Sequence, residues 1–427
     1  MPKPTRVRFK VLFFAVMLAG VTYLDRVAIS KTSSNIMAEL HLTNTEMGWV
    51  FSAFTIAYGI FEIPTGYWGD LIGSRRVLTR IVAWWSSFTV ATSLAFNLPS
   101  LIAVRFLFGI GEAGAWPNAA RTFSRWFPAG ERGTAQGVFF MGAHLAGGLT
   151  PMLVTAMLGV MNWRWIFVIF GLVGFVWASS WYWWFRDDPS EHSSVNAEEL
   201  HHIQGGRKIE APHAMHLSQF AEVLGNRNII LLCLMYFTQT YGFYFYITWL
   251  PSYLEKARGF SGMKSGFLAG LPMLLSVVAD LAGGLTTDAA VRRFGRRWGR
   301  AMVGIGSFLS ACIALALGTA ASDPVWAAVL IAIAAASANF PLGAAWSACI
   351  DIGGNRAGVV SAYMNTAGQV GGALSPLILG YVLDATGSYN APLYLTAGLY
   401  FFGALMWFGI NASKPMFGED RLGEDHS

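Results

Sequence analysis

The sequence is dominated by long apolar segments, each about as long as a helix needs to cross a lipid bilayer. A hydrocarbon core of about 30 Å requires about 20 residues of α-helix, and in lipid every backbone polar group must be bonded within its own segment. β-barrels need short alternating strands instead, and this pattern is absent from the sequence. The chain is therefore predicted to be an all-α membrane protein with twelve transmembrane helices, at residues 9–29, 46–68, 77–95, 98–124, 134–160, 163–185, 228–253, 262–289, 300–320, 323–348, 356–384 and 391–411.

Composition excludes the main soluble classes. Of the 427 residues 54% are hydrophobic and only 12% are charged, whereas soluble globular proteins carry about 25% charged residues. Three cysteines are too few for a disulfide framework or a Cys-rich metal site. The first apolar segment continues as a long span instead of ending at a cleavage site. We therefore expect neither a soluble domain nor a secreted protein.

The basic residues predict how the chain is oriented in the membrane. A formal net charge of +5 would suggest nucleic acid only if the charge formed a patch, and here the basic residues are scattered through short loops. If both termini are cytoplasmic, 22 of the 29 lysines and arginines fall on the cytoplasmic side. The positive-inside rule then predicts cytoplasmic termini. No nucleic-acid partner is expected.

The chain is predicted to consist of two halves. The one long polar stretch, from Arg186 to about Asn228, separates the apolar segments six and six. We expect an N-terminal six-helix bundle at 1–190, a cytoplasmic linker at 191–225 and a C-terminal six-helix bundle at 226–427. Residues 133–151 align without gaps to residues 358–376. Such internal repetition is typical of transporters, whose substrate sites lie near the midplane between the repeats.

A second repeated element follows the second and eighth predicted helices. Each copy combines glycines, an aspartate and an arginine pair in a tight cytoplasmic turn, where the carboxylate can pair with arginine and bond to a neighbouring helix end. Such a pair can hold one conformation of a transporter, so we predict a conformational latch. Its residues are Asp70, Arg75 and Arg76 in the first copy and Asp288, Arg296 and Arg297 in the second.

These features together resemble the major facilitator superfamily over essentially the whole chain. Within it, the stretches from Tyr23 to Arg26, from Arg105 to Glu112 and from Trp126 to Gly133 resemble the anion:cation symporter family. That family includes bacterial hexonate and hexuronate permeases and the sialic acid and vesicular glutamate carriers of animals. The first latch copy departs from the superfamily pattern at Leu71, where a basic residue is usual, so it is expected to form the weaker latch.

Four ionisable residues inside predicted spans indicate the chemistry. A charge at the bilayer centre costs at least about 2.5–3.5 kcal/mol, so it should face a wet cavity or a partner. Arg26 and Arg105 are suited to binding an organic anion, because a guanidinium group binds a carboxylate through two hydrogen bonds and stays charged. Asp25 and Glu112 suit proton coupling, because carboxyl groups in low dielectric can alternate between protonated and charged forms. The alternative is that Arg105–Glu112 and Asp25–Arg26 are static pairs.

The resemblance implies further substrate-binding residues. In the sugar-acid carriers, tyrosines of the first and second helices, a tryptophan of the tenth and an asparagine of the eleventh line the cavity. These positions correspond to Tyr23, Tyr58, Trp346 and Asn365.

One position departs from the sugar-acid carriers. A glutamine common in the fifth helix of those members is replaced by Ala143, which puts a polyhydroxylated substrate in doubt. The next residue, His144, either couples protons, given its ordinary pKa of about 6.5, or bonds to a neighbouring helix.

The predicted function is secondary active transport: proton-coupled uptake of a small carboxylate such as a hexonate or hexuronate. The alternative is exchange of organic or organophosphate anions without protons. An enzyme would need a nucleophile or metal constellation and a channel a filter segment, and the sequence has neither. We expect no cofactor, no metal, a monomer, and a bacterial inner membrane location, because the loops are short.

Overall fold

The computed structural model is almost entirely helical. It describes residues 4–42, 44–204, 217–248, 250, 253–254, 257–260, 262–386 and 388–416. Within the described part of the chain every regular element is helical. The middle of the predicted linker, including Arg207 and Lys208, lies outside these residues.

The chain divides into two compact units. Unit 1 comprises Met1–Pro128 and Gly142–His213, and unit 2 comprises Ala129–Met141 and Ala214–Ser427. Helix α6 (Arg132–Leu158) therefore begins in unit 2 and ends in unit 1. Its first turns group with unit 2 because small residues let two backbones meet: a Cβ at Gly137 would lie 2.3 Å from the Asp280 carbonyl oxygen. Such close approach is the usual role of small residues in membrane helix packing.

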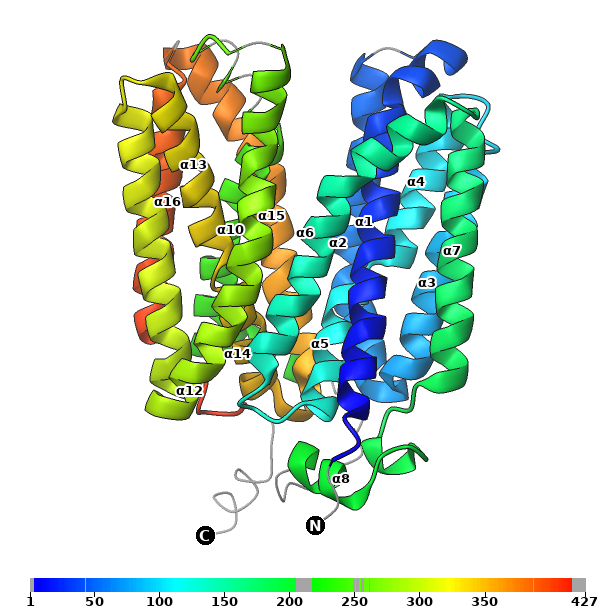
Figure 1. The fold of residues 1–427 in the computed structure, drawn as a ribbon, viewed down its shortest axis with the longest axis vertical. Coiled ribbons are helices and arrows are strands. Elements are labelled where there is room, and N and C mark those ends of the chain that lie inside the picture. Colours follow the sequence, from blue (N-terminus) through cyan, green and yellow to red (C-terminus); the bar gives the residue numbers. More distant parts are fainter. Residues whose placement is uncertain are drawn as a thin grey trace. The chain divides into compact units, whose positions relative to one another are not determined.

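Unit 1 contains the helices that correspond to the first six predicted spans (Figure 1). Its elements are α1 (Val7–Leu40), α2 (Asn44–Ile72), α3 (Ser74–Thr92), α4 (Leu98–Glu112), α5 (Ala115–Trp126), the later part of α6, and α7 (Trp163–Trp184). The predicted single helix 98–124 is broken between α4 and α5. The break occurs at Gly114, which has a φ of 85° and lies so close to Thr65 that a Cβ would come within 2.3 Å of its hydroxyl oxygen.

Unit 2 contains the helices that correspond to the second set of six spans. They are α10 (Arg227–Thr248), α12 (Gly262–Ala320), α13 (Pro324–Asn339), α14 (Leu342–Gly353), α15 (Ala357–Thr386) and α16 (Asn390–Gly409). The predicted spans 262–289 and 300–320 are both part of α12, which turns sharply at Gly295 (φ 74°). The predicted span 323–348 is broken before α14 at Pro341, because proline lacks the N–H that a continuous helix requires.

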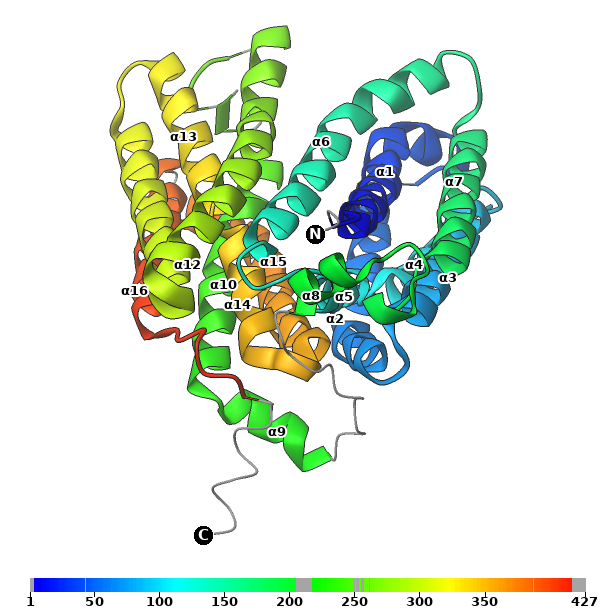
Figure 2. The same cartoon turned by 60° about the horizontal axis from the view of Figure 1, so that its bottom comes forward.

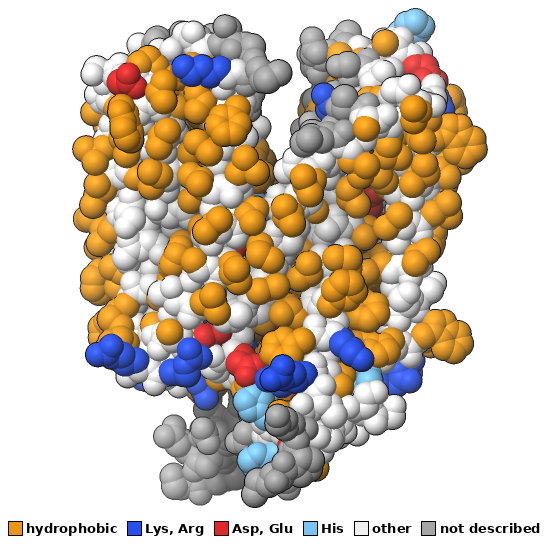
Figure 3. Space-filling view, viewed as in Figure 1, with side chains coloured by type: hydrophobic (Ala, Val, Ile, Leu, Met, Phe, Trp, Pro, Cys, Tyr) orange, Lys and Arg blue, Asp and Glu red, His pale blue; other side chains and the backbone are white. Residues whose placement is uncertain are grey.

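The helices suit a lipid environment. Seven helical stretches of the described residues are long and apolar enough to cross a membrane, and α12 is counted as one of them. On the face drawn in Figure 3, hydrophobic side chains cover the middle of the helices, and lysines and arginines lie towards their ends. This distribution is the one expected of multi-pass membrane proteins.

The linker holds the start of α1. Helix α8 (Ala197–Gln204) lies beside α5 (Figure 2), and its Glu199 carboxylate accepts hydrogen bonds from the backbone N–H groups of Val7 at 2.8 Å and Arg8 at 3.1 Å. The Thr5 hydroxyl donates to the same carboxylate at 2.5 Å. Burial alone would raise the pKa of Glu199, but these hydrogen bonds outweigh it and lower the pKa below its ordinary value. A linker carboxylate thus caps α1, as anions do at helix N-termini.

Candidate functional site

Helices α1 and α4 bring the four ionisable residues singled out from the sequence together inside unit 1. Asp25, Arg105 and Glu112 are each at most 2% exposed. The ion pair joins the two helices, because Arg26 Nε of α1 donates to Glu112 Oε1 of α4. Glu112 is thereby held by a residue of another helix. The alternative expectation paired Glu112 with Arg105, but in the structure the guanidinium that pairs with Glu112 comes from α1.

Arg105 is held by aromatic rings. Its guanidinium carbon lies 4.3 Å from the centre of the Phe108 ring and 5.2 Å from that of Phe54. Within the described residues no carboxylate lies within 4 Å of it, although Asp25 and Glu112 are close enough to act on it electrostatically. Cation–π contacts orient a guanidinium without occupying its N–H donors. Arg105 therefore keeps donors that a ligand anion can use.

Asp25 is a buried carboxyl group whose oxygens find no hydrogen-bond donor in the described part of the chain. Glu112 and Arg105 are its strongest charged neighbours. Thr89 of α3 lies beside it, but its hydroxyl donates to the Trp85 carbonyl. A buried ionised group without such partners is costly. This position thus disfavours a permanently charged carboxylate.

Tyr58 of α2 completes the group around the ion pair. It is 1% exposed, and the Arg26 guanidinium carbon lies 4.9 Å from the centre of its ring. Phe54, one turn earlier, lies 5.3 Å from the same carbon and also contacts Arg105. Two aromatic residues of one helix therefore support both guanidinium groups.

Tyr23 contacts His144 and also Trp116, a tryptophan that sequence reasoning missed. The Tyr23 ring lies edge-on to Trp116 of α5 at 6.3 Å and to His144 of α6 at the same distance. His144 is 3% exposed. The only sequence signal for Trp116 was an aromatic residue inside a predicted span.

Trp346 and Asn365 belong to unit 2 and are described within it. Trp346 Nε1 donates to the Tyr236 hydroxyl at 3.3 Å, with the two rings edge-on at 6.0 Å. Asn365 is buried on α15, three residues before Gly368, where a Cβ would lie 2.6 Å from the Tyr236 ring. Tyr236 of α10 is therefore the common neighbour of this part of α14 and α15.

In the first latch copy, Asp70 reaches a different helix. Its carboxylate forms an ion pair with Arg121 Nε of α5 at 3.4 Å, and Arg121 also pairs with Asp187 at 3.4 Å. Arg75 donates through Nε to the Tyr182 carbonyl at 2.8 Å. The Arg75 backbone N–H donates to the Asp187 carboxylate at 3.2 Å, but neither the Arg75 nor the Arg76 guanidinium has a carboxylate of the described residues within 4 Å. Arg121 and Asp187 are therefore latch-loop partners that the sequence pattern did not identify.

In the second copy, the aspartate binds the end of a helix, as the sequence suggested. Asp288 accepts hydrogen bonds from the backbone N–H groups of Gly133 at 2.9 Å and Thr134 at 2.6 Å, at the start of α6. The arginine pair lies elsewhere: Arg297 stacks on Trp298 at 5.0 Å, and Arg296 is exposed. A carboxylate at a helix N-terminus is favoured by the helix dipole.

A buried charge network beside this contact was not predicted. Asp351 of α14 pairs with Arg132 at 2.8 Å and with Arg300 of α12 at 2.7 Å. The Arg300 side chain is fully buried. The sequence does show these three charged residues at the ends of apolar segments. It does not show that they pair, because only the fold brings them together.

Metal-ligating side chains do not cluster in the described ranges: no group of three His, Cys, Asp or Glu residues there could hold a metal ion. The site is built from guanidinium, carboxyl and aromatic groups. These groups form ion pairs, hydrogen bonds and ring contacts.

Comparisons with known proteins agree with this architecture. The family model of the Major Facilitator Superfamily matches residues 15–376. A probable sulfoacetate transporter of Cupriavidus necator is 34% identical over 96% of this chain and 95% of its own length. The D-galactonate transporter of Escherichia coli is 31% identical over 92% of this chain and 94% of its own. The solved proton:xylose symporter XylE shares the fold with a TM-score of 0.75, at 15% identity over 95% of this chain and 96% of its own.

Proposed function

This chain belongs to the major facilitator superfamily, and we propose that it is a secondary transporter that takes up a small organic anion together with protons. The observation that carries the proposal is the unequal pairing of the four buried charges. Arg26 and Glu112 form an ion pair, whereas Arg105 lacks a carboxylate within 4 Å among the described residues and the Asp25 oxygens have no donor there. One cation is thus free for an anion, beside acids that can bind protons.

The anion is proposed to bind at Arg105. A planar guanidinium offers parallel N–H donors to a carboxylate, and such charge-assisted pairs are about twice as strong as neutral hydrogen bonds. Phe54 and Phe108 fix the guanidinium plane. Tyr23, Tyr58, Trp346 and Asn365 are proposed to contact the rest of the substrate.

Protons are proposed to act on Asp25 and Glu112. Protonation of Glu112 from outside weakens its pair with Arg26 and leaves two guanidinium groups for the substrate. Loss of the protons to the cytoplasm restores the pair and releases the anion. Alternating access between the two repeats would carry the cycle, as in other transporters built from repeats. His144 is proposed as a further proton-binding group.

The relatives support a substrate class. They include a probable sulfoacetate transporter, a probable galactarate/D-glucarate transporter, a D-galactonate transporter and a hexuronate transporter. We propose a sugar acid or a related small carboxylate for this chain. Because Ala143 stands where sugar-acid carriers often have glutamine, sulfoacetate belongs in the substrate panel beside the hexonates and hexuronates.

We propose a monomer in the bacterial inner membrane with both termini in the cytoplasm. Both repeats are supplied by one chain, and 22 of the 29 basic residues fall on one side under this topology. Seven helical stretches of the described residues are long and apolar enough to cross a membrane.

Uptake into proteoliposomes tests the function. A pH gradient, acidic outside, should drive accumulation of the radiolabelled substrate that best raises the melting temperature of the purified protein. Glu112→Gln and Asp25→Asn should abolish this gradient-driven accumulation and keep part of the exchange of internal for external substrate. Arg105→Gln should abolish both activities. The control is Glu191→Gln, which removes an exposed linker carboxylate and should leave transport unchanged.

Two results would contradict the proposal. If the unmodified protein accumulates substrate to the same extent with and without the pH gradient, anion exchange without protons would be favoured. Normal gradient-driven uptake by Glu112→Gln and Asp25→Asn would mean that these two carboxyl groups do not couple protons to transport.

A further inference from the structure

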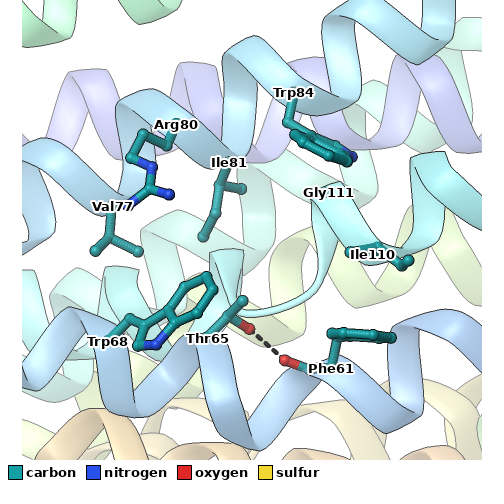
Figure 4. A pocket seen from close by; sticks show the side chains of 9 residues that line it. All are labelled: Phe61, Thr65, Trp68, Val77, Arg80, Ile81, Trp84, Ile110 and Gly111. Carbon is teal, nitrogen blue, oxygen red and sulfur yellow. Dashed lines mark hydrogen bonds between the residues drawn. The ribbon is translucent and has the colours of Figure 1, made fainter.

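A groove on unit 1 lies apart from the charged site. It is formed by α2, α3 and α4, encloses about 190 Å³, and is lined by Phe61, Thr65, Trp68, Val77, Arg80, Ile81, Trp84, Ile110 and Gly111. Figure 4 shows α3 along one side of it and α2 along the other, with Arg80 and Trp68 at one end and Trp84, Phe61 and Ile110 at the other. Every lining side chain except those of Thr65 and Arg80 is apolar or aromatic.

Arg80 is the one cation of this groove. Its guanidinium carbon lies 5.7 Å from the centre of the Trp68 ring, and none of the described carboxylates lies within 4 Å of it. It is six residues into α3, which begins at Ser74, so it lies about 9 Å along the helix from the end that carries the latch loop. An arginine at this depth reaches the level of lipid phosphates by extending its side chain.

The second repeat contains the same groove with different chemistry. Its equivalent, between α12 and α13, encloses about 550 Å³ and is lined among others by Thr286, Met302, Gly306 and Phe340. Thr286 lies as many residues before Asp288 as Trp68 lies before Asp70. Met302 lies as many residues after Gly295 as Arg80 lies after Gly73. Gly306 likewise takes the place of Trp84.

The two repeats share the groove but not the side chains that line it. A groove at this place is a property of the repeat, because both copies have it. The cation and the two tryptophans are properties of the first copy alone. Met302 and Gly306 leave the second groove uncharged and wider.

We infer that the groove of unit 1 binds an anionic phospholipid. Its phosphate pairs with the Arg80 guanidinium at the Trp68 end, and one acyl chain lies along Ile81, Phe61 and Trp84. The chemistry fits on both counts: an arginine without a protein counter-ion takes a phosphate bidentately, and basic pockets between transmembrane helices on the cytoplasmic side are typical sites for anionic headgroups. Tryptophan is favoured at the level of the headgroups.

Native mass spectrometry tests this inference on the purified full-length protein. Phosphatidylglycerol and phosphatidylcholine with identical acyl chains are titrated separately, so that the two lipids differ in net charge and headgroup. Phosphatidylglycerol should bind at least about tenfold more tightly, which is the effect of one strong charge-assisted hydrogen bond. Arg80→Gln should remove that preference and leave phosphatidylcholine binding unchanged, whereas Arg80→Lys should keep part of it.

The second repeat supplies matched controls. Arg293→Gln removes an exposed cation of unit 2 and should leave the phosphatidylglycerol preference intact. Met302→Arg places a cation in the second groove. This variant should gain a second binding site that prefers phosphatidylglycerol. Unchanged melting temperature and unchanged phosphatidylcholine binding show that each variant is folded.

Three outcomes would overturn the inference. The first is an unchanged phosphatidylglycerol preference in Arg80→Gln. The second is an equal loss of the preference in Arg293→Gln, which would reflect general surface charge. The third is displacement of the lipid by soluble glycerol phosphate at equal concentration, which would make Arg80 a site for a soluble anion. Transport activity plays no part in this readout.

Discussion

The buried network around Asp351 gives a prediction whose size follows from its geometry. Asp351 has one carboxylate oxygen 2.8 Å from Arg132 and the other 2.7 Å from Arg300, and the Asp351 and Arg300 side chains are fully buried. Asp351→Asn keeps the shape but removes the negative charge, so two guanidinium groups lose their counter-ion at once. Removing one partner of a buried ion pair typically costs about 3–5 kcal/mol. We expect a loss of this size.

Unfolding in mixed micelles, driven by sodium dodecyl sulfate and followed by tryptophan fluorescence, measures this loss. Combining Asp351→Asn with Arg300→Gln removes one of the two cations that Asp351 pairs with, so the double variant should be more stable than the sum of the single losses predicts. The difference should be about 1–3 kcal/mol, as for directly contacting residues. The control is Asp323→Asn at the N-cap of α13, where the aspartate accepts from the Trp326 N–H at 2.8 Å.

Asparagine caps a helix as well as aspartate does, so this control should cost little. A loss below about 1 kcal/mol for Asp351→Asn, or strictly additive single losses, would mean that water already reaches these charges and screens them. The argument from burial would then be refuted.

Two further predictions concern unit 1. Glu199→Gln should lower the melting temperature at neutral pH. Because hydrogen bonds outweigh burial and lower the pKa of Glu199, the stabilisation that its carboxylate provides is complete above pH 4.5 and is lost as the pH falls through the lowered pKa. The melting temperatures of the two proteins should therefore approach each other as the pH falls below 4.5 and become equal below the lowered pKa, and a difference that persists below that pKa would contradict the capping role. Gly69→Ala should cost about 1–3 kcal/mol, because its Cβ would lie 1.7 Å from the Asn118 side-chain oxygen. Gly59→Ala, on the same helix with open space around it, should instead be neutral or stabilising by up to about 1 kcal/mol, and equal effects of the two would refute this packing argument.

The course of the chain was predictable from the sequence because lipid imposes a single rule on every span. Apolar length alone located the helices, whereas the division into halves at 1–190 and 226–427 stays a prediction. What apolar length cannot detect is a local break or a turn. Gly114 and Pro341 interrupt predicted spans, and Gly295 joins two helices in one sharply bent segment.

The partners within the site were less predictable, because pairing is decided by which helices pack together. Helical spacing placed Arg105 and Glu112 on one face, but it could not show that Arg26 of α1 pairs with Glu112. The Asp70–Arg121 pair likewise joins two helices. Residue type identified the charges that enter the membrane, and only tertiary structure identified their counter-ions.

The four charges of Asp25, Arg26, Arg105 and Glu112 sum to zero when all are ionised, and this neutrality limits the stoichiometry of the proposed cycle. A monocarboxylate that enters alone would leave one uncompensated negative charge in low dielectric, so one proton must accompany it. A dianion such as sulfoacetate would require two. Transport would then be electroneutral for either substrate, and the membrane potential would neither drive nor oppose it. The number of protons moved would follow the charge of the cargo.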